Sequence, residues 1–168
     1  MGKKSIKQNK NIYQITREEL NYTRDKASEI LKYISSDRIE KIESEKTTPH
    51  PDEILIMAKK YKKPELCNYY CSHECDIGKF KVPTLEMKDI SQITLDVISS
   101  LNALYKQKDK FIDIVVDGQI SEDEYNDFKD IYHKLDLLSL SIDTLKLWIE
   151  KKMLEGNINE DFEVSKNV

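Results

Sequence analysis

Apolar residues recur at three- and four-residue steps along most of the chain, a spacing that places side chains on one face of a helix. Residues that cap or stop helices divide the first part of the chain: Thr23, Ser35 or Ser36, Pro49 and Pro51. The pattern predicts four short helices over residues 12–20, 24–31, 36–46 and 52–61. The fourth carries an apolar stripe formed by Ile54, Leu55, Met57, Ala58 and Tyr61.

Two much longer helices are predicted farther along, over residues 87–115 and 122–154. The second has apolar residues in alternating three- and four-residue steps, a heptad pattern typical of helix–helix packing: Phe128, Ile131, Leu135, Leu138, Ile142, Leu145 and Ile149. The two helices are expected to form an antiparallel hairpin. Because two helices alone bury little apolar surface, we expect the hairpin to pack on the first part of the chain or on a second copy.

The connection between the long helices imitates a calcium-binding loop from Asp113 to Glu124. Val115, however, occupies the third position of that loop, where an oxygen ligand belongs. We therefore expect a tight turn at Asp117-Gly118 instead of a calcium site. Gly118 would adopt a positive φ, and Ser121 and Glu124 would cap the second helix.

Composition supports an all-α fold and argues against nucleotide binding through a glycine-rich loop. The chain has four glycines in 168 residues, all isolated, so neither G-x-G-x-x-G nor a P-loop can be written. Charge is unevenly distributed: residues 1–66 hold 15 Lys and Arg against 11 Asp and Glu, whereas residues 67–168 hold 12 against 20. A basic first part with an acidic remainder is typical of a nucleic-acid-binding head on a body that does not bind nucleic acid.

The chain has no apolar run long enough for a membrane span, and its first eleven residues, MGKKSIKQNKN, lack the apolar core of a signal peptide. We therefore expect a cytoplasmic protein with no membrane partner. In that compartment cysteines are reduced, which favours metal binding or simple burial over disulfides.

A more specific pattern lies within residues 10–66. Ala27 is a small residue in the second helix, and Ile34 precedes the third. The third helix then has an Ile-x-x-Ile-Glu core of Ile39, Ile42 and Glu43, and after the Pro49 loop the fourth helix supplies Leu55 and Ala58. These residues resemble the λ-repressor-like, or Xre-type, family of helix-turn-helix regulators.

The resemblance implies a five-helix head whose third helix enters the major groove of double-stranded DNA while neighbouring segments contact phosphates. It assigns DNA contact to a set of nine residues: Thr23, Arg24, Ser35, Ser36, Asp37, Arg38, Glu40, Lys41 and Lys46. The chain departs from the family at Glu45, where a glycine commonly ends the recognition helix. Asp37 and Glu40 also place negative charge where DNA would lie, although carboxylates can accept hydrogen bonds from cytosine. Two functions stay open: a dimeric transcriptional regulator, and an adaptor or antirepressor that uses the same fold to hold another regulatory protein.

The predicted helix-turn-helix domain is followed by a segment with several reactive and metal-ligating side chains, PELCNYYCSHECDIG. Cys67, Cys71 and Cys75 recur every four residues, with His73 between the last two, and these side chains are suitable ligands for zinc or an iron–sulfur cluster. On one continuous helix the outer cysteines would be about 12 Å apart, too far for one metal ion, so a shared site requires the helix to end near residues 72–74. The alternative is that the cysteines pack as small apolar residues or respond to oxidation. The segment also resembles clostridial-type regulators that carry a cysteine cluster directly after this head.

The predicted organisation is a flexible basic arm (1–10), a helix-turn-helix domain (11–66), a cysteine-rich joint (67–86), a helical hairpin for dimerisation or partner binding (87–155) and a flexible tail (156–168). No pairing of a nucleophile with a base supports catalysis, and we expect the protein not to be an enzyme.

Overall fold

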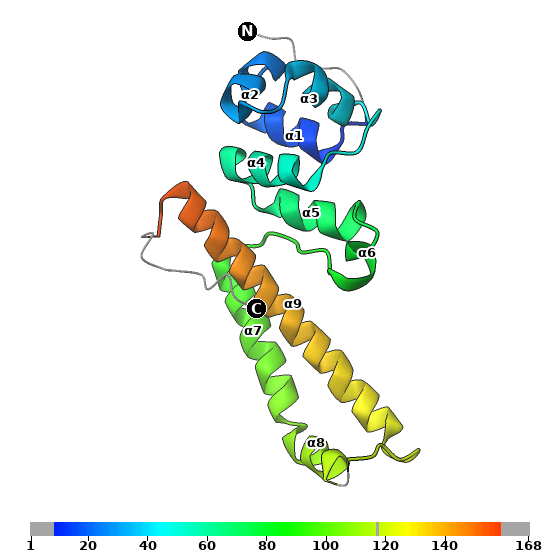
Figure 1. Cartoon of the computed structure of the whole chain (residues 1–168). Coiled ribbons are helices and arrows are strands. Elements are labelled where there is room, and N and C mark those ends of the chain that lie inside the picture. Colours follow the sequence, from blue (N-terminus) through cyan, green and yellow to red (C-terminus); the bar gives the residue numbers. More distant parts are fainter. Residues whose placement is uncertain (1–8, 117, 159–168) are drawn as a thin grey trace. The chain divides into compact units, whose positions relative to one another are not determined.

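The computed structural model describes residues 9–116 and 118–158, and these contain nine helices and no strand (Figure 1). The predicted all-α class is therefore confirmed over the described residues. The helices are α1 (Ile12–Glu19), α2 (Arg24–Leu31), α3 (Ser36–Glu43), α4 (Pro51–Tyr61), α5 (Glu65–His73), α6 (Gly78–Lys81), α7 (Ile90–Tyr105), α8 (Lys108–Val115) and α9 (Tyr125–Glu155). No helix in the described ranges has the length and apolar character needed to cross a membrane.

The chain divides into two compact units. Unit 1 comprises Met1–Thr84 with Glu150–Val168, and unit 2 comprises Leu85–Ile149. Most of the predicted basic arm and tail, residues 1–8 and 159–168, lies outside the described residues.

Unit 1 contains α1 to α6, and its first helices begin where the sequence supplies a capping side chain. Asn11, Thr23 and Ser35 each accept a hydrogen bond from a backbone N–H in the first turn of the following helix. Pro51 occupies the first turn of α4, where its missing N–H costs nothing. The helices enclose one apolar cluster of eleven buried residues: Tyr13, Ala27, Leu31, Ile34, Ile39, Ile42, Ile54, Met57, Ala58, Tyr61 and Leu66.

Leu55 corrects the predicted stripe of α4. Its side chain is 63% exposed, whereas Ile54, Met57, Ala58 and Tyr61 are buried. The physical reason is the helical period, since Met57, Ala58 and Tyr61 lie within about 60° of Ile54 around the helix, whereas Leu55 lies about 100° from it, beyond the face that α4 buries.

The third helix is shorter than predicted, ending at Glu43 instead of Lys46. Glu45 has a φ of 59°, and the next residue's N–H reaches back to the carbonyl of Lys41 at 2.9 Å. The helix therefore ends with a left-handed residue, as it would with glycine, but here a side chain occupies that strained conformation. Asn21, Lys32 and Lys62 also have positive φ after α1, α2 and α4.

In unit 2, α9 packs antiparallel to α7 and α8 (Figure 1). Ser100 contacts Ser141 (Oγ–Oγ 3.5 Å). Gln107 Nε2 donates to Asp130 Oδ2 (3.2 Å), and Lys110 Nζ donates to Asp127 Oδ1 (2.8 Å). Later residues of the first arm thus meet earlier residues of α9, as in a hairpin.

Two details of the predicted hairpin are wrong. The first arm is not one helix, because α7 ends at Tyr105 and α8 begins at Lys108, within a polar stretch that offers α9 no apolar side chain. The heptad seam of α9 is also incomplete. Ile131 is fully buried, but Leu135 is 37% exposed, and the buried residues near the other end are Thr144 and Leu147.

The turn between α8 and α9 has the predicted conformation at the residues described. Gly118 has a φ of 71°, and the Glu124 carboxylate accepts hydrogen bonds from the Ser121 N–H (2.9 Å) and hydroxyl (2.7 Å). Asp117, which the calcium-loop comparison used, lies outside the described residues.

Candidate nucleic-acid interface

The α2–α3 pair is held by small and branched apolar side chains. Ala27 on α2 is completely buried, and Ile34 in the connecting turn and Ile39 on α3 are each 2% exposed. A larger residue than alanine at position 27 would push the two helices apart, since nothing there is open to solvent. This packing fixes which face of α3 is turned away from the core.

That outward face contains part of the predicted groove contacts. Asp37 and Lys41 are exposed on the side of α3 opposite Ile39 and Ile42, and Ser35 is exposed at the N-cap. Ser36 and Glu40 are half-buried, because the helical period places them toward the flank that contains buried Glu43. Helix N-terminal side chains in this position are the ones that reach base edges in helix-turn-helix proteins.

Both acidic residues of this face have lysine partners. Asp37 lies 2.8 Å from Lys41 Nζ, and Glu40 lies 3.1 Å from Lys46 Nζ. The hydrogen bond from Lys41 lowers the pKa of the Asp37 carboxyl below its ordinary value. Over residues 23–46 there are six Lys and Arg and six Asp and Glu, so this segment carries no net charge.

Arg38 makes its contacts within unit 1. Its guanidinium donates two hydrogen bonds to the carboxylate of Glu53, at 2.8 and 2.7 Å, and one to the Thr47 hydroxyl at 2.7 Å. The hydrogen bond with Glu53 raises the pKa of Arg38 and lowers that of Glu53. This arginine therefore ties α3 to the start of α4.

Arg24, the other predicted arginine contact, belongs to a buried cluster that sequence analysis did not find. Arg17 donates to both carboxylate oxygens of Glu43, at 2.5 and 2.8 Å, and Arg24 Nε donates to Oε2 at 2.9 Å. The side chains of Arg17 and Glu43 are 8% and 1% exposed, whereas that of Arg24 is 39% exposed. Hydrogen bonding to Glu43 raises the pKa of Arg17.

Part of this cluster can be predicted from the sequence. The Ile-x-x-Ile-Glu pattern places Glu43 in the core, and a carboxylate in a core needs a cationic partner. Arg17 falls four residues after Tyr13, on the buried side of α1. Sequence spacing cannot choose among the arginines, because the partners are 26 residues apart.

Cys67 and Cys71 lie on α5, and Cys75 follows its end. Burial raises the pKa of the Cys67 thiol to about 11. Cys75 Sγ instead accepts a hydrogen bond from the Gly78 N–H at 3.4 Å.

His73 stacks on Tyr69, with ring centroids 4.4 Å apart, and its Nδ1 lies 2.8 Å from the Ser72 hydroxyl. Although α5 ends where a shared metal site would require, the described residues contain no group of three or more His, Cys, Asp or Glu side chains arranged to hold a metal ion. The structure therefore does not bring the four predicted ligands together in such a group. Binding of zinc or an iron–sulfur cluster stays a prediction, which metal analysis of protein purified without oxygen would check.

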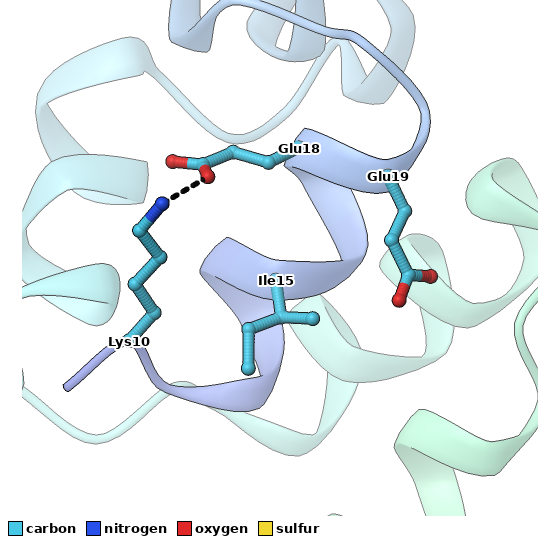
Figure 2. A pocket seen from close by; sticks show the side chains of 4 residues that line it. All are labelled: Lys10, Ile15, Glu18 and Glu19. Atoms are coloured by element: carbon cyan, nitrogen blue, oxygen red, sulfur yellow. Dashed lines mark hydrogen bonds and ion pairs between the residues drawn. The ribbon is translucent and has the colours of Figure 1, made fainter. Parts of the chain in front are cut away.

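A surface hollow of about 290 Å³ lies on α1 (Figure 2). Its lining residues are Lys10, Ile15, Glu18 and Glu19. Lys10 Nζ pairs with Glu18 at 2.6 Å, and Glu19 points to the other side of Ile15 and pairs with Lys63 at 3.1 Å. The charged groups are therefore directed toward separate partners instead of a common point where a ligand would lie.

Comparisons with protein-family models, with curated proteins and with solved structures found no match to this chain.

Proposed function

We propose that the chain is a sequence-specific DNA-binding regulator whose α2 and α3 form a helix-turn-helix of the λ-repressor-like kind. The observation that carries this proposal is the two-sided character of α3. Ile39, Ile42 and Glu43 are at most 2% exposed, while Asp37 and Lys41 lie exposed on the opposite side and Ser35 is exposed at the N-cap. A helix held rigidly by one face can present the other to base edges in the major groove.

The exposed side chains have the chemistry for base contacts. A lysine can donate to the O6 and N7 acceptors of guanine, a carboxylate can accept from the N4 amine of cytosine, and serine can do either. Asp37 and Lys41 are adjacent, so the pair can address a G·C base pair by exchanging their mutual ion pair for contacts with the two bases. Because residues 23–46 carry no net charge, we attribute recognition mainly to these hydrogen bonds and less to a broad phosphate attraction.

A single head contacts few bases, and regulators of this kind gain affinity by binding two half-sites about one helical turn apart as dimers. The proposal therefore includes a pair of chains, each presenting one head to one half of a two-fold operator.

The test is selection from a random duplex library by the full-length protein, purified without oxygen, at two salt concentrations. We expect one short motif to be recovered, with affinity that falls as salt rises, but less steeply than for a protein that binds mainly through phosphate contacts. Lys41→Ala should weaken binding to that motif by roughly tenfold. Lys129→Ala, which removes an exposed lysine from unit 2, serves as the control for total charge. Recovery of no motif by the folded protein would overturn the proposal.

A second candidate function is an adaptor that binds another regulatory protein through the same face. It is favoured by the neutral, ion-paired surface of α3 and by Tyr33, whose side chain is 85% exposed in the turn before α3. Exposed aromatic residues are frequent anchors of protein interfaces. An Asp37 and Lys41 double alanine variant that leaves DNA affinity unchanged at every salt concentration would favour this function.

A further inference from the structure

The outward face of α7 in unit 2 carries apolar side chains and no charge. Leu95, Ile98, Leu101 and Tyr105 follow one another at steps of three, three and four residues, and are 64%, 51%, 45% and 67% exposed. The positions interleaved with them, Thr94 and Asn102, are uncharged. Such spacing places all these side chains on one face of the helix.

This face is not the one that packs on α9. Ser100, which contacts Ser141 of α9, shares the opposite side of α7 with Ile93 and Leu104. Ile93 is 1% exposed, and Ser100 and Leu104 are half-buried. Helix α7 therefore has one apolar side that α9 covers and a second apolar side that no described residue of unit 2 covers.

The charge content of α7 is that of a helix buried on all sides. Among its sixteen residues only Asp96 is charged, and it is paired with Lys88 at 2.9 Å. By contrast, eleven of the thirty-one residues of α9 are charged. Helices that face water normally carry charged residues there, so the outward side of α7 has the composition of a contact surface.

We propose that a second copy of the chain covers this face, α7 against α7, so that two hairpins complete a four-helix bundle. In a two-fold contact residue i of one copy meets residue j of the other, and j meets i, so the same face must be complementary to itself. The α7 face has no charges and is therefore compatible with itself. Apolar residues at three- and four-residue steps are also the pattern by which helices of a bundle interdigitate.

Unit 1 does not supply an equivalent counterpart. A sixteen-residue helix is about 24 Å long, so its partner must offer apolar side chains over a similar length. Among the described residues, the exposed large apolar side chains of unit 1 come from separate segments: Ile15, Tyr33, Leu55, Ile77 and Phe80. A second α7 offers the whole stripe at once. The inference rests on the proposed function at one point: the α7 contact would bring together the two heads that DNA binding as a dimer requires.

The mass of the full-length chain in solution tests the inference, measured by light scattering over a range of micromolar concentrations. We expect twice the chain mass of 19.7 kDa. Ile98→Glu should weaken association by about 100-fold or more, because it would bury an unpaired carboxylate from each chain in an apolar contact, and should leave helix content by circular dichroism unchanged. Asn102→Lys, which alters an already polar and exposed position, should have the same effect.

Ile112→Glu is the matched control, since Ile112 lies on α8 and is 57% exposed, close to the value for Ile98. It should remain a dimer. A wild-type mass of one chain, or a dimer that survives both Ile98→Glu and Asn102→Lys, would overturn the inference. The outcome is separable from the DNA-binding proposal: a dimer that these variants dissociate but that selects no DNA motif contradicts only the latter. Motif selection by a single-chain protein contradicts only the α7 contact.

Discussion

The two units of the molecule bury their apolar side chains to very different extents. Unit 1 encloses eleven residues in one cluster, drawn from α1 to α5 and the turn before α3. Among the described residues, unit 2 fully buries only four apolar side chains, Ile93, Ile114, Ile131 and Leu147. It exposes thirteen of the eighteen large hydrophobic residues that the described part of the chain leaves exposed.

This difference indicates that the units have different structural requirements. Short helices that cross one another can enclose a core among themselves, as those of unit 1 do. Two long antiparallel helices share only one face each, so their other faces remain in solvent unless a third element covers them. Unit 1 therefore has the burial expected of an independent domain, whereas unit 2 requires further contacts to bury its apolar side chains.

The strongest test of the comparison is the removal of one ionic side chain from each unit. Glu43→Ala leaves the Arg17 guanidinium buried without a counter-charge, and we expect it to lower the free energy of unfolding of unit 1 by about 3–5 kcal/mol. Hydrogen exchange measured by mass spectrometry would follow each unit separately.

Asp143→Ala is the corresponding change in unit 2. Asp143 pairs with Lys146 at 3.4 Å, and the lysine side chain is 70% exposed, so the expected loss is below about 0.5 kcal/mol. Equal losses in free energy of unfolding for the two substitutions would show that the Arg17–Glu43 ion pair does not stabilise unit 1 more than an exposed pair stabilises unit 2.

Leucine truncation should give the next largest difference. Leu31 in unit 1 is 1% exposed, and Leu31→Ala should lower the free energy of unfolding by about 3 kcal/mol, because it leaves a cavity. Leu137 in unit 2 is 44% exposed, and Leu137→Ala should cost less than about 0.5 kcal/mol. Urea titration followed by circular dichroism would measure both, and a large effect at Leu137 would mean that this residue is covered in solution.

Substituting one glycine in each unit compares how closely the backbone of each unit is packed. A Cβ at Gly78 would lie 2.0 Å from the carbonyl oxygen of Cys71, so Gly78→Ala should force α6 away from α5 and cost about 1–3 kcal/mol. At Gly118 a Cβ would meet nothing within 4 Å, and the only penalty of Gly118→Ala is its φ of 71°.

Gly118→Asn should recover most of the loss at that position, because asparagine tolerates a left-handed backbone. Gly78→Asn should recover none. Thermal unfolding of the four variants would measure these effects, and a tolerated Gly78→Ala would contradict the close approach of α6 to α5.

The smallest expected effect is a gain in stability. Glu45 has a φ of 59°, so Glu45→Gly relieves strain while adding freedom to the unfolded chain, and we expect a net gain of about 0.5 kcal/mol in unit 1. Ser44→Gly is the control, since Ser44 has a φ of −89° and should lose stability by a similar amount. A loss of stability in both variants would contradict the left-handed end of α3 at Glu45.

Much of the helical pattern could be predicted from local sequence. The predicted bounds of α2 agree with the structure, and Thr23 and Ser35 cap α2 and α3, because a capping hydroxyl and its backbone partner lie within a few residues of each other. The conformation of Gly118 and the Ser121–Glu124 contact followed from the same local chemistry. Asp37 and Lys41 share the exposed side of α3 because they are four residues apart in one helical segment.

The contacts of the arginines were not predictable in this way. Arg38 and Arg24 were assigned to DNA by resemblance, but Arg38 binds Glu53, and Arg24 shares Glu43 with Arg17. Each acidic partner lies fifteen or more residues away, so the pairing depends on which helices approach one another. The same limit applies to the cysteines, whose spacing allows a shared site but does not determine whether the thiols converge.

The sequence by itself determined the all-α class, the division into short and long helices and the apolar positions of the first core, because helical periodicity and capping are local properties. Only the tertiary structure decided that Leu55 faces solvent, that Glu43 is buried between two arginines, and that α7 has an uncovered apolar side. Which face of a helix is covered depends on the neighbours that the chain brings to it, and apolar spacing alone does not specify those neighbours.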